Sequence, residues 1–255
     1  MNNFPLIFMH IPKCGGTSLN DWFKDFSKLN KIYYFRSGVK SINAEFDFRY
    51  YGFEKEIPKN SIFSGHFVFN KFLKNFFWIT CVRKIEDLFF SSLYFHYFRT
   101  WQQKSLNVET LDSLSKLNIS LDMTKRDEIL INYVLDNNLI TSNIITKFFA
   151  GIRNNKFFFC NKDLKINDTD FDLAKENLKY FDHIFPAENT IDFLKKLSLD
   201  LNLSYPNYVQ KNKTSKHIGN YDPELLLDHK NNYRKKILSY NKYDYKILKL
   251  LNFYY

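Results

Sequence analysis

The sequence contains little cysteine: its 255 residues include only Cys14, Cys81 and Cys160. The three are odd in number and far apart, and no CxxC pair or Cys/His spacing typical of a metal site accompanies them. We therefore predict neither a disulfide framework nor a zinc site. Cys81 lies within an apolar segment and is expected to be a core residue.

Long hydrophobic runs are also missing. No segment reaches the roughly 18 consecutive apolar residues that a membrane-spanning helix needs. The short apolar run at the N-terminus is not preceded by the basic region of a signal peptide. These absences predict a soluble cytoplasmic protein without a transmembrane segment, although peripheral contact with a membrane stays open.

Positive charge is in excess, with 37 Lys and Arg against 27 Asp and Glu. The resulting net charge of +10 suits a nucleotide or another anionic ligand. A composition that favours Lys, Asn, Ile and Phe explains the same surplus equally well. The charge alone therefore identifies no binding partner. We do not expect the protein to bind nucleic acid.

Short apolar segments alternate along the chain with longer segments of helical period. Strands are predicted at residues 6–10, 31–35, 61–64, 76–82 and 183–185. Helices are predicted at residues 17–26, 85–100, 126–136, 171–180, 190–201, 223–240 and 243–253, and the polar stretch 101–121 is expected to be a loop or lid. This alternation is typical of a parallel sheet covered by helices on both faces. The sequence therefore predicts a single α/β domain over residues 1–255.

A glycine-containing loop follows the first predicted strand, in the stretch FMHIPKCGGTSL at residues 8–19. A loop of this kind at a helix N-terminus binds anions, because unpaired backbone N–H groups and the helix dipole both face the ligand. Gly15 and Gly16 allow close approach, Lys13 adds a positive charge, and Thr17 and Ser18 add hydroxyl donors. The order strand, loop, helix predicts a P-loop-like three-layer fold with a phosphate site.

Two better-known phosphate motifs are absent from this loop. A Walker A motif places its lysine after the second glycine, whereas Lys13 precedes both, and no GxGxxG is present. The simpler alternative is an ordinary strand–turn–helix corner in which Thr17 or Ser18 is the helix N-cap.

A second phosphate site is predicted where the strand at residues 76–82 ends. Arg83 follows that strand, and Ser91 lies eight residues further on, in the adjoining helix. A guanidinium fork and a hydroxyl placed in this way can hold one phosphate from two sides. The alternative is a structural ion pair of Arg83 with Glu86 or Asp87.

His66 is the candidate catalytic base. It follows Gly65 directly after a predicted strand, at the sheet edge where open α/β sheets bind ligands. The glycine-containing loop and Arg83 follow strands of the same sheet, so all three are expected to meet at that edge. His10, which ends the first strand, is the rival histidine, and we interpret it as a residue that shapes the loop.

The string PKCGGTSL resembles the 5′-phosphosulfate loop of sulfotransferases that use 3′-phosphoadenosine 5′-phosphosulfate (PAPS). It is similar to PKTGGTSL in carbohydrate sulfotransferases related to heparan sulfate 2-O-sulfotransferase, including bacterial members, with Cys14 in place of threonine. Those enzymes also carry a catalytic His in a Gly-His element and a 3′-phosphate motif R-D-P-x-x-R-x-x-S. Arg83 and Ser91 match the motif's ends, whereas Lys84, Ile85 and Leu88 depart from it.

The resemblance implies that the chain is a bacterial-type sulfotransferase without the membrane anchor of its animal relatives. The cosubstrate would be PAPS, the product adenosine 3′,5′-bisphosphate, and the acceptor a hydroxyl of a saccharide or glycolipid, with no metal. The implied 5′-phosphosulfate contacts are Lys13, Cys14, Gly15, Gly16, Thr17 and Ser18. Arg83 and Ser91 would bind the 3′-phosphate, Lys216 another part of the nucleotide, and His66 with Lys13 would be catalytic.

Weaker similarities extend this resemblance along the chain. Residues 143–151 are similar to an N-x-x-T-x-x-L-x-G segment of the family, and residues 174–197 to its late helix–strand–helix, with Glu188 at the place of a recurrent Glu. Two alternatives remain open. One is a P-loop kinase-like phosphotransferase, and the other is a non-catalytic nucleotide- or glycan-binding protein on a degenerate sulfotransferase fold.

Overall fold

The computed structural model describes residues 5–37, 59–93, 142–152, 165–208 and 223–253, together with 128, 131–132 and 134–136. It contains a five-stranded sheet with the order β2-β3-β1-β4-β5, in which every pairing is parallel. The strands are β1 (Leu6–Met9), β2 (Tyr33–Ser37), β3 (Ser61–Gly65), β4 (Phe77–Val82) and β5 (His183–Pro186). The predicted α/β class and its parallel sheet are confirmed.

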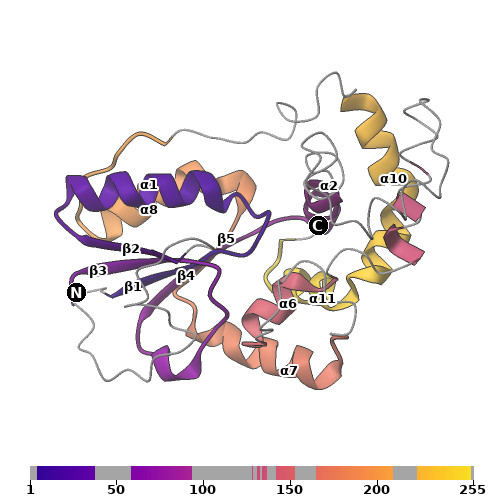
Figure 1. Cartoon of the computed structure of the whole chain (residues 1–255), viewed down its shortest axis with the longest axis horizontal. Helices are drawn as coiled ribbons and strands as arrows, with labels where there is room; N and C mark the ends of the chain where they lie inside the picture. The colour runs from indigo at the N-terminus through magenta and orange to yellow at the C-terminus, as the bar shows by residue number, and fades with distance from the viewer. Residues whose placement is uncertain are drawn as a thin grey trace, which may run out of the picture.

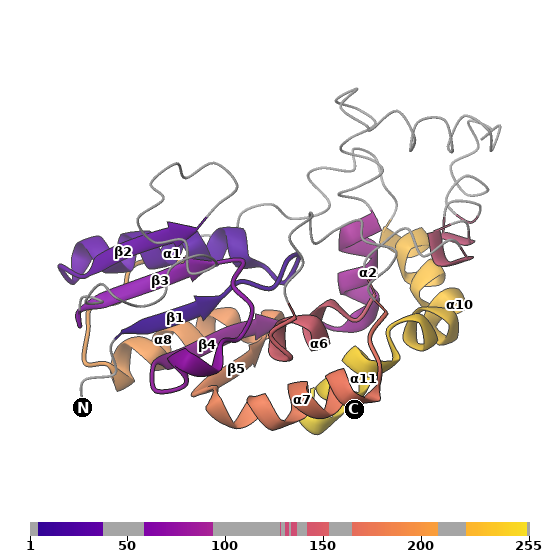
Figure 2. The ribbon, with the colours of Figure 1, turned by 60° about the horizontal axis from the view of Figure 1, so that its bottom comes forward.

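Helices lie on both sides of this sheet. α1 (Gly16–Leu29) and α8 (Thr190–Asp200) lie on one side, and α7 (Asp168–Asn177) and the short η2 (Lys71–Leu73) lie on the other (Figure 1). Four more helices gather beyond the carboxyl ends of the strands, as Figures 1 and 2 both show. They are α2 (Ile85–Leu93), α6 (Ile144–Phe149), α10 (Pro223–Tyr240) and α11 (Lys242–Leu250). Two further short helices are η4 (Leu178–Tyr180) and η5 (Ala187–Asn189).

The central strands are buried along their whole length. All four residues of β1 are at most 1% exposed, and Phe63 of β3 and Trp78 of β4 are equally enclosed. Near-continuous apolar strands are expected where helices cover both faces of a parallel sheet. Cys81, in β4, is 1% exposed and is a core residue, as predicted.

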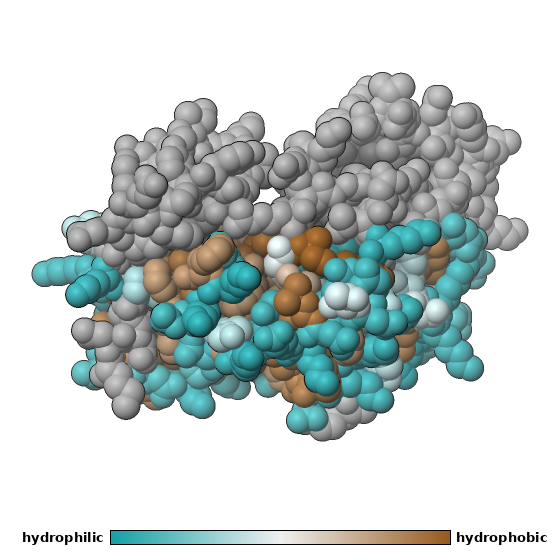
Figure 3. Space-filling view, turned by 90° about the horizontal axis from the view of Figure 1, so that it is seen from below, coloured by the Kyte–Doolittle hydropathy of each residue, from teal (hydrophilic) through white to brown (hydrophobic). Residues whose placement is uncertain are grey.

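The described surface on the side of α7 is largely polar (Figure 3). Seen from the side on which α7 lies, hydrophilic residues cover much of the described face, and hydrophobic residues gather near its centre (Figure 3). The most exposed large apolar side chains, Phe72 and Leu199, belong to separate elements, η2 and α8. Single exposed apolar residues of this kind are ordinary on a protein surface.

All five predicted strands are present, each with bounds within two residues of those predicted. The helix predicted over 85–100 begins at Ile85 and is described as far as Leu93, and residues 128, 131–132 and 134–136 are helical as expected. α6 was not predicted as a helix, because its six residues are all buried and show no helical period. The expected loop at 101–121 lies outside the described residues, as does Cys160.

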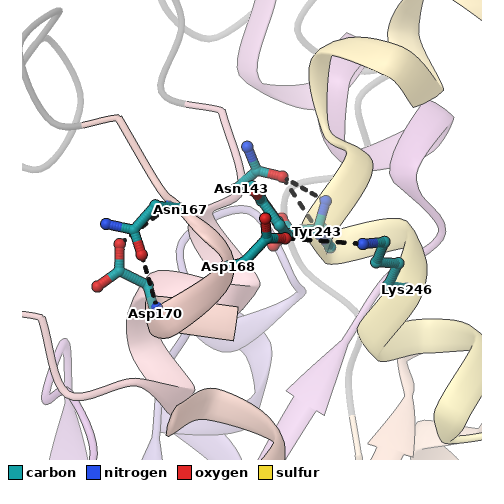
Figure 4. A network of polar contacts seen from close by, with 7 residues as sticks. Asn143, Asn167, Asp168, Asp170, Tyr243 and Lys246 are labelled. Atoms are coloured by element: carbon teal, nitrogen blue, oxygen red, sulfur yellow. Dashed lines mark hydrogen bonds and ion pairs between the residues drawn. The ribbon is translucent and has the colours of Figure 1, made fainter. Parts of the chain in front are cut away.

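α6 and α11 cap each other across about a hundred residues of sequence, and Figure 4 shows Asn143 at the start of α11. The side-chain oxygen of Asn143 accepts the backbone N–H groups of Tyr243 (2.9 Å) and Asp244 (3.3 Å) at the start of α11. In return, the carboxylate of Asp244 accepts the backbone N–H groups of Ile145 (3.0 Å) and Thr146 (2.7 Å) and the Thr146 hydroxyl (2.7 Å). These bonds satisfy N–H groups that each helix would otherwise leave unpaired.

Replacing Asp244 with asparagine should lower the free energy of unfolding by about 1–3 kcal/mol, since a buried amide cannot accept from all three donors. The matched control is Asp168→Asn, which removes an exposed ion pair with Lys246 at 4.0 Å on the neighbouring helix surface. That control should change stability by about 0.5 kcal/mol or less. Urea unfolding of both variants measures the difference, and equal effects would contradict the assigned role of Asp244.

Candidate functional site

The loop that joins β1 to α1 runs from residue 10 to residue 15 and contains two residues in the left-handed region, Lys13 (φ 67°) and Gly15 (φ 81°). Gly15 is the N-cap of α1, so no side chain caps this helix. The alternative that Thr17 or Ser18 is the N-cap is therefore wrong. Both residues lie inside the first turn of α1, where their N–H groups are among those that an anion can accept from.

Gly16 is required by the packing of His10. A Cβ atom at position 16 would lie 1.8 Å from both Cδ2 and Nε2 of the His10 imidazole, a distance that no side chain tolerates. A Cβ at Gly15 would meet nothing within 4 Å, but its positive φ favours glycine. The two positions thus require glycine for different reasons. Gly15 is needed for its backbone conformation, and Gly16 is needed because the His10 ring lies close to it.

His10 is held in place by buried polar groups. The side-chain N–H of Asn20 donates to His10 Nδ1 at 3.3 Å, and the side-chain Oδ1 of Asn20 accepts from the Ser64 hydroxyl. Burial lowers the pKa of His10 well below its ordinary value of 6.5, and the nearby His66, Arg36 and Lys13 lower it further. His10 is therefore neutral near pH 7, with its proton on Nε2.

His66 lies directly against His10. Met9 pairs with Gly65 in the sheet, so the residues that follow these two strand ends are neighbours. The two imidazoles stack with ring centroids 4.2 Å apart, and His66 Nδ1–H donates to the backbone carbonyl of His10 at 2.8 Å. Burial lowers the pKa of His66 from 6.5 more than this hydrogen bond raises it. The ring is thus neutral, and its Nε2 has a free lone pair that can accept a proton.

Arg83 lies on the other side of the loop, after β4. Its Nη1–H group donates to the backbone carbonyl of Lys13 at 3.4 Å. Glu86 instead pairs with Arg234 at 2.9 Å, and Asp87 pairs with Lys230, both on α10. The alternative prediction, a structural ion pair of Arg83 with Glu86 or Asp87, is therefore wrong, and the guanidinium lies beside the β1–α1 loop.

The remaining predicted contacts differ in their exposure. Thr17 is exposed, whereas Ser18 (3%) and Ser91 (9%, on α2) are buried. The thiol of Cys14 is 1% exposed, and burial raises its pKa to about 12, so this side chain is a neutral core group and only its backbone can face an anion. Lys216 lies outside the described residues.

Two charged residues at the same sheet edge were not selected from the sequence as functional. Arg36, at the exposed end of β2, is close enough to lower the pKa of both His10 and His66. Glu188 follows β5, and its charge raises the pKa of Cys14 and Cys81. The rule that residues after parallel strands meet at one edge would have found Arg36, had it been applied to the second predicted strand.

No family model matches the sequence, and no curated protein matches it. None of the helices formed by the described residues combines the length and apolar character that crossing a bilayer takes. Within the same residues, no cluster of three or more His, Cys, Asp and Glu side chains is placed to hold a metal ion. The fold and the site together define an α/β protein with a glycine-containing loop at a helix N-terminus, a neutral histidine and an arginine at one sheet edge.

Proposed function

We propose that the protein is a PAPS-dependent sulfotransferase that transfers a sulfuryl group to a hydroxyl of a carbohydrate or glycoconjugate. The observation that supports this most directly is the fixed tautomer of His66 beside the phosphate loop. Its Nδ1–H is bound to the His10 carbonyl, which leaves Nε2 as the proton acceptor. A neutral base next to an anion site is what transfer of an anionic group to a hydroxyl requires.

The nucleotide would be held at two places. The N–H groups of the first turn of α1, with Lys13, Thr17 and Ser18, would bind the 5′-phosphosulfate. Arg83 and Ser91 would bind the 3′-phosphate. The hydrogen bond from Arg83 to the Lys13 carbonyl connects this second phosphate site to the loop.

In the proposed reaction, the acceptor oxygen attacks sulfur in line with the leaving phosphate oxygen. The new S–O bond forms while the S–O bond to the 5′-phosphate breaks, and the hydroxyl proton passes to Nε2 of His66. Lys13 stabilises the negative charge that develops on the departing oxygen of adenosine 3′,5′-bisphosphate.

The kinase-like alternative is weakened by the position of Lys13 before both glycines. The non-catalytic alternative rests on the changed residues after Arg83. Two of these, Ile85 and Leu88, lie in α2, are at most 5% exposed and belong to the hydrophobic core of the protein. A second arginine at position 88 would be buried there, so its replacement by leucine strengthens the packing of α2.

Isothermal titration with adenosine 3′,5′-bisphosphate tests the proposal. Binding is expected in the micromolar range, about −8 kcal/mol, and absence of binding at millimolar ligand would contradict the proposed function. Bound PAPS without transfer to any acceptor in a broad saccharide screen would favour the non-catalytic alternative, and magnesium-dependent ATP turnover would favour the kinase.

Replacing Arg83 with alanine should lower the affinity for adenosine 3′,5′-bisphosphate about 10- to 100-fold, because a charge-assisted hydrogen bond is lost. Adenosine 5′-phosphate, which has no 3′-phosphate, should bind nearly as before. Arg234→Ala is the matched control, since Arg234 pairs with Glu86 on the far side of α2. Equal losses for the two nucleotides would remove Arg83 from the 3′-phosphate site.

A further inference from the structure

The Nε2 nitrogen of His10 is a hydrogen-bond donor whose proton no described residue accepts. The other ring nitrogen, Nδ1, accepts from the Asn20 side chain, so the neutral ring carries its proton on Nε2. No hydrogen bond joins Nε2 to any described residue. The residue is nevertheless only 9% exposed. A buried N–H group without an acceptor costs free energy, so proteins normally supply one.

This nitrogen is not sealed inside the protein. Among the described residues, Nε2 of His229 is the one fully enclosed side-chain nitrogen or oxygen that lacks a hydrogen bond. His10 Nε2 lacks a hydrogen bond too, and it therefore retains contact with the outside of the protein. A ligand atom can reach this donor, although most of the His10 side chain is buried.

The Nε2 nitrogen lies at the N-terminus of α1. A Cβ atom built on Gly16, the first residue of this helix, would have Nε2 and Cδ2 of His10 as its nearest neighbours, both at 1.8 Å. The end of the ring opposite Nδ1 therefore lies against the Gly16 backbone. The imidazole of His66 stacks on the same ring, with centroids 4.2 Å apart. The donor is thus close both to the start of the helix and to the candidate base.

Two backbone N–H groups at the start of α1 also lack an acceptor. The earliest backbone hydrogen bond of this helix joins the Leu19 N–H to the Gly15 carbonyl at 3.5 Å. The N–H groups of Gly16 and Thr17 have no acceptor among the described residues. Such groups form the positive end of the helix dipole, where anions bind. An anion with several oxygens can accept from these two groups and from the His10 ring together.

We propose that His10 is an anion ligand, whose Nε2–H donates to an oxygen of a sulfate or phosphate group bound by the first turn of α1. Asn20 is then a positioning residue, because its bond to Nδ1 keeps the proton on Nε2. In the sulfotransferase that we propose, the anion is the 5′-phosphosulfate, and this part of the inference rests on the proposed function.

Magnetic resonance of protein labelled with nitrogen-15 in its histidines tests the donor directly, with inorganic sulfate as the probe. Proton–nitrogen correlation spectra at neutral pH distinguish ring nitrogens that carry a proton from those that do not. The signals missing from His10→Gln belong to His10. They should place the proton on Nε2, and sulfate should shift the Nε2 signals more than those of Nδ1. A proton on Nδ1, or His10 signals that sulfate leaves unchanged, overturns the inference.

His10→Gln and His10→Met form a matched pair of variants. The two side chains are similar in length, but only glutamine has an N–H donor near the place of Nε2. Both variants lose the ring and its stacking on His66, so the difference between them reports the donor. In calorimetric titrations, His10→Met should bind sulfate and adenosine 3′,5′-bisphosphate about 10- to 100-fold more weakly than wild type, whereas His10→Gln should keep most of the affinity.

The control is His183→Met, the same substitution at the amino end of β5, which should bind both ligands like wild type. Equal affinities of His10→Gln and His10→Met for sulfate overturn the inference. Thermal unfolding checks that the variants fold. If either of them does not, the wild-type spectrum decides, with His10 assigned from its contact with the His66 ring.

These measurements separate the two proposals. If adenosine 3′,5′-bisphosphate fails to bind wild type, the proposed function fails, while the sulfate experiments still decide the role of His10. If the nucleotide binds wild type, His10→Gln and His10→Met equally well, the role of His10 fails and the proposed function stands.

Discussion

His66→Ala should reduce sulfuryl transfer by about 10²–10⁴-fold, while adenosine 3′,5′-bisphosphate binds within about twofold of wild type. The loss is large because no other described side chain at this position offers a free nitrogen lone pair: the proton of His10 is on Nε2, and its Nδ1 is bound by Asn20. The measurement is initial-rate transfer from PAPS, combined with calorimetric titration of the product.

The pH dependence of the same reaction gives a second readout. Transfer requires neutral His66, so activity is lost as the pH falls through the pKa of this group. Burial holds that pKa below 6.5, and the acidic limb of kcat/KM should therefore lie below pH 6.5. His183→Ala is the control. His183 is the first residue of β5 and lies at the amino end of its strand, whereas His66 follows the carboxyl end of β3. Full activity in His66→Ala would show that another group is the base.

Gly16→Ala should abolish nucleotide binding and lower the free energy of unfolding by about 1–3 kcal/mol or more, the range for overpacking a filled core. The added methyl group cannot coexist with the His10 imidazole 1.8 Å away, so the first turn of α1 must move. Calorimetric titration of adenosine 3′,5′-bisphosphate and urea unfolding measure the two effects.

A double-mutant cycle identifies the cause of the Gly16→Ala defect. His10→Ala removes the imidazole, and the double variant should regain part of the stability that Gly16→Ala alone loses, with a coupling energy of about 1–3 kcal/mol. Gly15→Ala is a matched control, since its methyl group would meet no atom and only the positive φ is strained. Additive effects of the His10 and Gly16 substitutions would contradict the packing explanation.

Much of the fold could be predicted because its signals are local. The strands are short apolar runs with turn residues between them, and α10 begins at a proline, which favours the first position of a helix. α7 begins three residues earlier than predicted, at Asp168, because Asn167 and Asp170 form a capping box (Figure 4). That signal was present in the sequence as Asn167 followed by Asp170.

The candidate site could be predicted only in part, because its details depend on contacts between distant residues. The order of the loop, His66 and Arg83 after three strands indicated a common edge, and the register of Met9 with Gly65 brings His10 and His66 together. No sequence pattern predicts the stacking of these two rings or the tautomer of His66. The partner of Arg83 could not be predicted either. Glu86 and Asp87 pair with Arg234 and Lys230 of α10, which lie more than 140 residues later in the sequence.

The mutual capping of α6 and α11 has a consequence for the order of folding during synthesis. A helix of six residues is not stable by itself, and the first turn of α6 depends on a carboxylate 98 residues later in the chain. The ribosome must therefore have made the chain as far as Asp244 before α6 is stable. The strands of the sheet and the loop between β1 and α1 are complete earlier, so they can assemble first. Translation thus delays completion of this end of the fold until α11 has emerged.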